Sequence, residues 1–239
     1  MPSPERLEAV IERLRRAERP ILHVDPDPGD VRTVALLPGS FDPPTVAHAA
    51  VAEAALGRAD TVVAVYSVRA LPKEGPVPPP LLSEPDRLAA LRRFCVARPG
   101  VVMGLCSHGL LAEQARAARA RFPQAGLWLV MGSDKVLQLL DPRWYGDRDS
   151  ILEGLFADAG VLYAVRAGEE EAVEQSLVGR ENVRWRGRFE RLAVQPEAAA
   201  ISSREVRERL ARGEDASHLV PAEIRPLLGA RNIGRGPGH

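Results

Sequence analysis

Thr45 and His48 are the first side chains in this sequence whose types and spacing suit chemistry. They stand three residues apart at the expected start of a helix, so both lie on one face at its positive end. The apolar run 34–37 predicts a buried strand, and Gly39 and Ser40 allow a tight turn where that strand ends. Threonine is a preferred helix N-cap residue. A strand, a glycine turn and a helix N-terminus together predict a phosphate site.

A second group of polar side chains opens another expected helix near residue 202. Ser202 and Glu205 have the spacing of a capping box, which leaves further backbone N–H groups free to face an anion. Arg207 lies four residues beyond Ser203, so its guanidinium can reach the same first turn. The alternative is an ordinary, well-capped amphipathic helix.

These two groups carry a family resemblance. Residues 39–48, Gly-Ser-Phe-Asp-Pro-Pro-Thr-Val-Ala-His, resemble the G-[TS]-F-D-P-x-[HT]-x-G-H signature of the nucleotidyltransferases related to class I aminoacyl-tRNA synthetases. Residues 201–207, Ile-Ser-Ser-Arg-Glu-Val-Arg, are similar to the second signature of that superfamily, I-S-S-T-x-I-R. The order and the separation of the two segments argue against a chance match. We call them the first and the second signature segment.

A third segment narrows the resemblance. Met131-Gly132-Ser133-Asp134, followed by Trp144, is similar to the G-x-D…W segment of nicotinate- and nicotinamide-mononucleotide adenylyltransferases. The resemblance implies transfer of AMP from ATP to the mononucleotide phosphate, with release of pyrophosphate, for NAD biosynthesis. Such a transfer requires two aligned phosphates and hydrogen-bond donors that stabilise charge on the equatorial and leaving oxygens. Mg²⁺ is expected with the triphosphate, bound largely through the phosphates themselves.

Most predicted site residues stand at matching motif positions, whereas Lys73 comes from the proline-rich loop after the second predicted strand and His108 from the segment after the third. The predicted catalytic residues are His48, as donor to the α- or β-phosphate, together with Thr45 and Arg207. Nucleotide contacts are predicted at Gly39, Ser40, Phe41, His48, Gly132, Asp134, Ser202, Ser203 and Arg207. Acceptor contacts are predicted at Ser40, Lys73, Arg87, His108 and Trp144.

Several of these residues have a structural alternative. Asp134 is expected to bind ribose hydroxyls or to cap the helix 135–140, and Trp144 to stack on a pyridine ring or to pack against the core. Arg87 could be a surface helix residue, and His108 could cap a helix. Arg166, after the fifth predicted strand, is similar to a family arginine near the nucleotide phosphates.

Some positions depart from the adenylyltransferase pattern. Threonine at position 45 also occurs in phosphopantetheine adenylyltransferases and cytidylyltransferases, Ala47 replaces a glycine, and Arg204 replaces a threonine. Ser107-His-Gly-Leu-Leu111 stands where relatives that use nicotinate mononucleotide carry S-Y-T-x-x-T. Two alternatives therefore remain open: a cytidylyl- or adenylyltransferase for another phosphorylated metabolite, and a nucleotide-sensing protein without turnover.

Composition sets the class of protein. The chain has 239 residues, of which 45% are hydrophobic, and its 32 basic residues balance 32 acidic ones, so nothing favours nucleic acid or a membrane surface as a partner. Two cysteines without CxxC spacing predict buried thiols rather than a zinc site or a disulfide framework. We expect a cytoplasmic protein, because the N-terminus lacks a signal peptide pattern and no apolar run reaches membrane-spanning length.

The elements that must position these residues alternate along the chain. Strands are predicted at 33–37, 61–67, 101–106, 127–131, 161–165 and 192–195, and helices at 45–56, 84–97, 110–122, 150–157 and 169–178. Residues 185–191, where aromatic and arginine side chains alternate, are expected to form a loop that enters the last strand. This alternation predicts an α/β protein with a Rossmann-like, doubly wound parallel sheet.

The domain boundaries follow from this pattern. Residues 31–239 are expected to form the nucleotidyltransferase domain, with a core at 31–197, C-terminal helices at 198–233 and a flexible tail at 234–239. Residues 1–30 are predicted to be a helical extension, with a short strand at 21–24, that serves packing or assembly into a homo-oligomer.

Overall fold

One seven-stranded sheet runs through the molecule in the order β1-β4-β3-β2-β5-β6-β7. The computed structural model describes residues 4–69, 80–144 and 147–232. The strands are β1 (Leu22–Asp25), β2 (Thr33–Pro38), β3 (Thr61–Ser67), β4 (Val101–Cys106), β5 (Gly126–Gly132), β6 (Gly160–Ala164) and β7 (Phe189–Arg191). All neighbouring pairs are parallel except β1 with β4.

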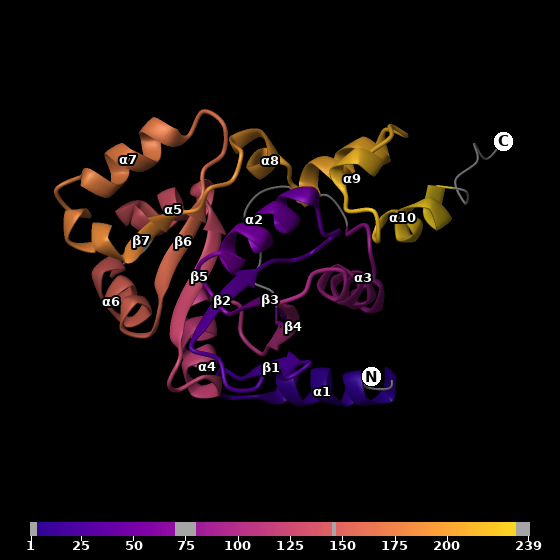
Figure 1. Cartoon of the computed structure of the whole chain (residues 1–239), viewed down its shortest axis with the longest axis horizontal. Helices are drawn as coiled ribbons and strands as arrows, with labels where there is room; N and C mark the ends of the chain where they lie inside the picture. Colours follow the sequence, from indigo (N-terminus) through magenta and orange to yellow (C-terminus); the bar gives the residue numbers. More distant parts are fainter. Residues whose placement is uncertain (1–3, 70–79, 145–146, 233–239) are drawn as a thin grey trace.

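Two helical layers cover the sheet because successive strand residues point to opposite faces. In β2, Ala35 and Leu37 pack with one layer, whereas Val34 and Leu36 pack with the other. The first layer holds α1 (Pro4–Arg16), α2 (Val46–Leu56) and α3 (Glu84–Val96). The second holds α4 (Leu111–Arg121), α5 (Ser133–Leu140), α6 (Arg148–Asp158) and α7 (Glu170–Val178). Figure 1 shows α2 and α3 across the sheet from α6 and α7.

The strand order places a switch point at the centre of the sheet. Counted from β2, the parallel strands lie in the order 3-2-1-4-5-6, the arrangement of a doubly wound sheet, so the predicted Rossmann-like fold is confirmed. Chain connections leave β2 and β5 in opposite directions, and a crevice outside their carboxyl ends is where such sheets bind ligands. The first signature segment follows β2, and Ser133 and Asp134 follow β5.

The N-terminal segment contributes an edge strand to this sheet. β1 runs antiparallel to β4, with Leu22 opposite Cys106 and Asp25 opposite Met103. Ile11 and Leu14 of α1 belong to the core of the first layer, and Leu14 is fully buried. The predicted short strand therefore exists, shifted by one residue, and in Figure 1 it lies beside α1 at the foot of the sheet.

The prediction for the last strand was wrong. The strand β7 is Phe189–Arg191, three residues before the expected start, and residues 183–188 form the 3₁₀ helix η2 (Val183–Arg188) in place of a loop. Trp185 of η2 packs against Phe156 with ring centroids 5.3 Å apart. The apolar run at 192–195 misled the prediction because its first residue, Leu192, is buried just beyond the strand.

The C-terminal part forms short helices beyond the first layer. They are α8 (Pro196–Ala200), α9 (Ser203–Ala211), η3 (Ser217–Leu219) and α10 (Arg225–Asn232), and Figure 1 shows α9 and α10 at the same end of the molecule. The predicted tail 234–239 lies outside the described residues. Among the helices that the structure describes, none combines the length and the apolar character that a membrane crossing requires.

Candidate functional site

Phe41 shapes the turn that follows β2. Its backbone is left-handed, with φ of 45°, and its ring is fully buried. The ring lies across Gly39, where a Cβ atom would come within 2.9 Å of the ring Cζ. Gly39 is therefore required because of space, and the unusual backbone angle belongs to Phe41 rather than to the glycine. The Gly39 N–H donates to Val65 O over 3.0 Å, which holds the turn, with the partly exposed Ser40, against β3.

Thr45 and His48 form a closed pair at the start of α2. Thr45 is the N-cap, as predicted, and its Oγ1 accepts from His48 N over 3.4 Å. The Thr45 N–H donates to His48 Nδ1 over 3.0 Å, and Thr45 Oγ1 lies 2.7 Å from the same nitrogen. A backbone N–H can only donate, so Nδ1 is the unprotonated nitrogen and the ring proton resides on Nε2. The pair thus fixes the imidazole as an Nε2–H donor.

The electrostatic surroundings keep this imidazole neutral. Burial lowers the pKa of His48 to about 4, and the positive charge of Arg166 adds to the shift. The ring packs against Phe41 with centroids 5.0 Å apart, which supplies much of the apolar environment. At neutral pH, His48 therefore offers a hydrogen-bond donor without a positive charge.

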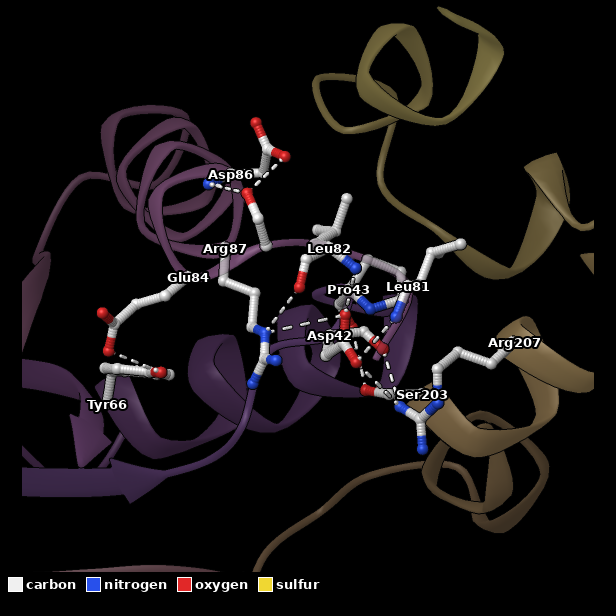
Figure 2. A network of polar contacts seen from close by, with 11 residues as sticks. Asp42, Pro43, Tyr66, Leu81, Leu82, Glu84, Asp86, Arg87, Ser203 and Arg207 are labelled. Carbon is white, nitrogen blue, oxygen red and sulfur yellow. Dashed lines mark hydrogen bonds and ion pairs between the residues drawn. The ribbon is translucent and has the colours of Figure 1, made fainter. Parts of the chain in front are cut away.

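The second signature segment docks on the first. Ser203 Oγ donates to Pro43 O over 2.8 Å, and Arg207 Nη1 donates to Asp42 O over the same distance. These contacts join residues 160 or more positions apart in the sequence. Figure 2 shows Ser203 and Arg207 converging on Asp42 and Pro43. The two signature segments therefore lie side by side in the fold.

The capping box at the start of α9 is only half formed. Ser202 is the N-cap, and its hydroxyl accepts from Glu205 N over 3.1 Å. The Glu205 carboxylate instead accepts from Arg209 Nε over 3.2 Å, one turn along the helix. The Arg204 side chain is 56% exposed, and its Nε lies 3.7 Å from Glu208 Oε1 one turn along the helix.

A polar cluster lies across the switch point, at the ends of β5 and β6. Asp134 Oδ1 and Arg166 Nη2 form an ion pair of 3.4 Å, and the Arg166 N–H donates to Ser133 Oγ over 3.0 Å. Ser133 Oγ in turn donates to Glu169. The N-cap of α5 is Gly132, so the alternative in which Asp134 caps a helix was wrong. A Cβ at Gly132 would lie 2.7 Å from Asp134 Oδ1, so glycine leaves room for that carboxylate.

A family model described as cytidylyltransferase-like matches residues 36–209. The chain belongs to this family. The match begins within β2 and ends within α9, so it spans both signature segments and the switch point between them. As a member of the cytidylyltransferase-like family, which lies within the HxGH nucleotidyltransferase superfamily, the protein is a nucleotidyltransferase.

Curated relatives cover most of the chain. A protein of Anaeromyxobacter sp. (strain K), named "Probable nicotinate-nucleotide adenylyltransferase", is 31% identical over 215 residues, which cover 86% of this chain and 98% of the relative. A protein of the same name from Aeromonas salmonicida (strain A449) is 28% identical over 212 residues, covering 80% of this chain and 92% of the relative.

Arg87 is drawn inward, toward the first signature segment. Its side chain is 19% exposed, and its Nε donates to Leu82 O over 3.1 Å and lies 3.8 Å from Asp42 Oδ1. Arg87 is therefore partly enclosed, and its contact with an acceptor stays a prediction. Arg207 is also enclosed, with a side chain that is 7% exposed. Its described contacts are within the protein, so its predicted role at the triphosphate stays a prediction too.

His108 lies at the end of β4, beside a residue that sequence reasoning overlooked. Its Nδ1 is 2.8 Å from Ser107 Oγ, and Arg69 Nη2 approaches both ring nitrogens to 3.1 Å. Helix α4 begins at Leu111, where Glu113 accepts from Leu110 N, so the alternative in which His108 caps this helix was wrong. Arg69 lies two residues beyond the end of β3, and a basic residue just after a predicted parallel strand was the signal that could have found it.

Two predicted acceptor residues cannot be placed. Lys73 lies outside the described residues, and of Trp144 the structure gives the backbone, at the end of η1 (Pro142–Trp144). The residue most conspicuously missed by sequence reasoning is Asp42. It lies inside the first signature segment, is 4% exposed and contacts both Arg87 and Arg207.

Proposed function

We propose that this nucleotidyltransferase transfers AMP from ATP to nicotinate or nicotinamide mononucleotide and releases pyrophosphate, a step of NAD biosynthesis. The observation that carries the proposal is the neutral His48, held as an Nε2–H donor at the N-terminus of α2 beside the docked second signature segment. The names of the curated relatives support an adenylyl group as the one transferred and nicotinate mononucleotide as the acceptor.

The bonds formed and broken in this transfer balance without a proton being carried between residues. A phosphate oxygen of the acceptor forms a bond to the α-phosphorus of ATP, while the bond from that phosphorus to the bridging oxygen of the β-phosphate breaks and pyrophosphate departs. The Nε2–H of His48 donates to a phosphate oxygen whose negative charge grows during this exchange. The backbone N–H groups at the first turns of α2 and α9 add positive potential from both sides.

Magnesium is the expected companion of the triphosphate. Among the residues that the structure describes, there is no group of three or more His, Cys, Asp or Glu side chains that could hold a metal ion. A Mg²⁺ ion would be held mainly by the phosphate oxygens of the substrate and would neutralise part of their charge.

A second candidate, another phosphorylated acceptor or CTP as donor, is favoured by Thr45 and by the segment that replaces S-Y-T. In the place of the S-Y-T segment, this chain has an imidazole and a guanidinium in contact at the end of β4. Such a pair of donors suits an anionic substituent, and nicotinate is only one of the acceptors that carry one.

The decisive experiment is an assay of pyrophosphate release by the purified protein. ATP and CTP are each tested with Mg²⁺ and with nicotinate mononucleotide, nicotinamide mononucleotide, phosphopantetheine or glycerol 3-phosphate. We expect the highest kcat/KM with ATP and nicotinate mononucleotide. Turnover with CTP or a different acceptor would replace the proposal by the second candidate. Nucleotide binding without pyrophosphate from any pair would favour a sensor.

A further inference from the structure

Asp42 is a buried carboxylate at the junction of three chain segments. It follows Phe41 in the first signature segment, and 4% of its surface is exposed. Its Oδ1 accepts from Leu82 N over 2.8 Å and its Oδ2 from Leu81 N over 3.2 Å. Asp42 thereby fixes the chain just before α3, 40 positions away in the sequence.

Two arginines from different helices approach the same carboxylate. Arg87 Nε of α3 lies 3.8 Å from Asp42 Oδ1, and Arg207 Nη1 of α9 lies 3.5 Å from Asp42 Oδ2. Each guanidinium has a second anchor nearby, Leu82 O for Arg87 and Asp42 O for Arg207. Figure 2 shows the two side chains reaching Asp42 from opposite sides.

The charges in this cluster do not balance. One carboxylate faces two guanidiniums, which are 19% and 7% exposed, so the cluster carries a net positive charge in a poorly solvated place. Among the described residues, the buried Nε of Arg207 finds no hydrogen-bond partner. Without Asp42, both arginines would lose the negative charge that makes their enclosed positions tolerable.

We propose that Asp42 is a positioning residue of the transfer reaction. It holds Arg87 and Arg207 at set places on either side of the first signature segment, and it leaves one positive charge uncompensated for the phosphates of the two substrates. Asp42 itself touches no substrate and acts through the two arginines. This inference rests on the proposed function, because it assigns the surplus charge to the phosphates that are joined there.

The first test compares two carboxylates that make the same kind of backbone contact. Asp60 accepts from Arg32 N and Thr33 N, each over 2.9 Å, at the amino ends of β2 and β3, whereas Asp42 follows the carboxyl end of β2. We expect Asp42→Asn to raise KM for both ATP and acceptor by about 10-fold or more, the scale of one hydrogen bond to a charged group, while kcat falls less. Asp60→Asn should leave both KM values within about two-fold. An Asp42→Asn enzyme with unchanged KM values and only a lower melting temperature would overturn the proposal.

A double-mutant cycle tests whether Asp42 acts through the arginines. Asp42→Asn is made in the wild type and in the Arg87→Met/Arg207→Met background. If the arginines carry its effect, the substitution should change KM by less than about two-fold in that background. Equal effects in both backgrounds would contradict the proposal. Should Asp42→Asn fail to fold, Arg87→Lys and Arg207→Lys retain the charge but lose the forked guanidinium, and each should raise KM without a large change in kcat.

A binding measurement separates this inference from the proposed function. If the wild type releases no pyrophosphate with any acceptor, the proposed function fails. Calorimetric titration with ATP and Mg²⁺ still tests Asp42, because the dissociation constant should rise by about 10-fold in Asp42→Asn and not in Asp60→Asn. Equal ATP affinity in Asp42→Asn and wild type would show that Asp42 serves the fold alone.

Discussion

The hydrogen bond from Thr45 N to His48 Nδ1 decides which atom of the imidazole can meet a substrate. Because it comes from the backbone, no side-chain substitution at position 45 other than proline removes it. Thr45 itself is fully buried and its hydroxyl faces the same nitrogen. Within the proposed mechanism, Thr45 is therefore a positioning residue, and His48 is the residue that touches phosphate.

Replacing His48 removes the proposed donor to the growing phosphate charge. We expect His48→Ala to lower kcat by about 10²- to 10³-fold, the effect of losing one such donor, while ATP affinity stays within a few-fold. Initial rates of pyrophosphate release and calorimetric ATP binding measure the two quantities. His48→Gln, which retains an N–H donor, serves as the matched variant and should recover part of the rate. A His48→Ala enzyme with normal kcat would remove His48 from the reaction.

The lowered pKa of His48 also predicts how stability depends on pH. In the unfolded chain, histidine titrates near its usual pKa of about 6.5, whereas burial lowers the pKa of His48 in the folded protein to about 4. The unfolded state therefore binds more protons between these values, and the free energy of unfolding falls as pH decreases through this range, by at most about 3 kcal/mol.

Urea unfolding at pH 7.5 and pH 4.5 measures this contribution. The wild type should lose more stability between the two pH values than His48→Gln, which has no group to titrate at this position. An NMR titration of the ring should show His48 neutral at pH 6. Equal pH dependence in both proteins would mean that His48 is solvated and titrates normally.

At the scale of elements, two glycines differ in the space around them: one is closely packed inside the sheet and the other lies on an open helix surface. A Cβ at Gly104 in β4 would lie 2.5 Å from Val63 Cγ1, inside the sheet, whereas a Cβ at Gly154 in α6 would meet nothing within 4 Å. We expect Gly104→Ala to destabilise the protein by about 1–3 kcal/mol, and Gly154→Ala to stabilise it by up to about 1 kcal/mol. Thermal or urea unfolding of the two variants tests the pair. A stabilising Gly104→Ala would show that β3 and β4 are less closely packed than described.

Strands that are buried on both faces were predictable from the sequence, whereas a partly exposed edge strand was not. β3 and β4 are buried almost throughout, so their apolar runs marked both ends at the observed residues. β7 is a short edge strand of Phe189, Glu190 and Arg191. The first two residues are partly exposed and the third is exposed, so the strand has no apolar run by which it could be predicted. Its position is set by pairing with β6, a contact that sequence patterning cannot display.

In the candidate site, contacts between residues close in the sequence were predictable, whereas contacts between distant segments were not. The Thr45–His48 pair was predictable because both residues belong to one helical turn and local spacing places them on one face. Asp42 was not, because its partners Leu82, Arg87 and Arg207 lie 40 or more positions away and meet it only in the folded protein. Local chemistry is readable from sequence, whereas long-range charge pairing requires the fold.

At the scale of the whole molecule, the N-terminal segment contributes buried side chains from α1 and β1 to the hydrophobic core. Leu14 of α1 is fully buried within the same hydrophobic cluster as β2, β3 and β4. We therefore expect Leu14→Ala to cost about 2–5 kcal/mol of global stability, with a single cooperative transition followed by both circular dichroism and tryptophan fluorescence. Val96→Ala, at a residue that is 77% exposed, should change stability by less than about 0.5 kcal/mol. A separate early transition in Leu14→Ala would instead mark the N-terminal segment as an independent appendage.

The antiparallel edge strand sets an order of events during synthesis on the ribosome. Among the described strands, Leu22–Asp25 pairs only with Val101–Cys106, about 80 positions later in the chain. Until that later strand has left the exit tunnel, the earlier one has no place in a sheet, and the apolar face of the helix before it has no core to cover. The first segment to be made is therefore among the last to reach its native contacts.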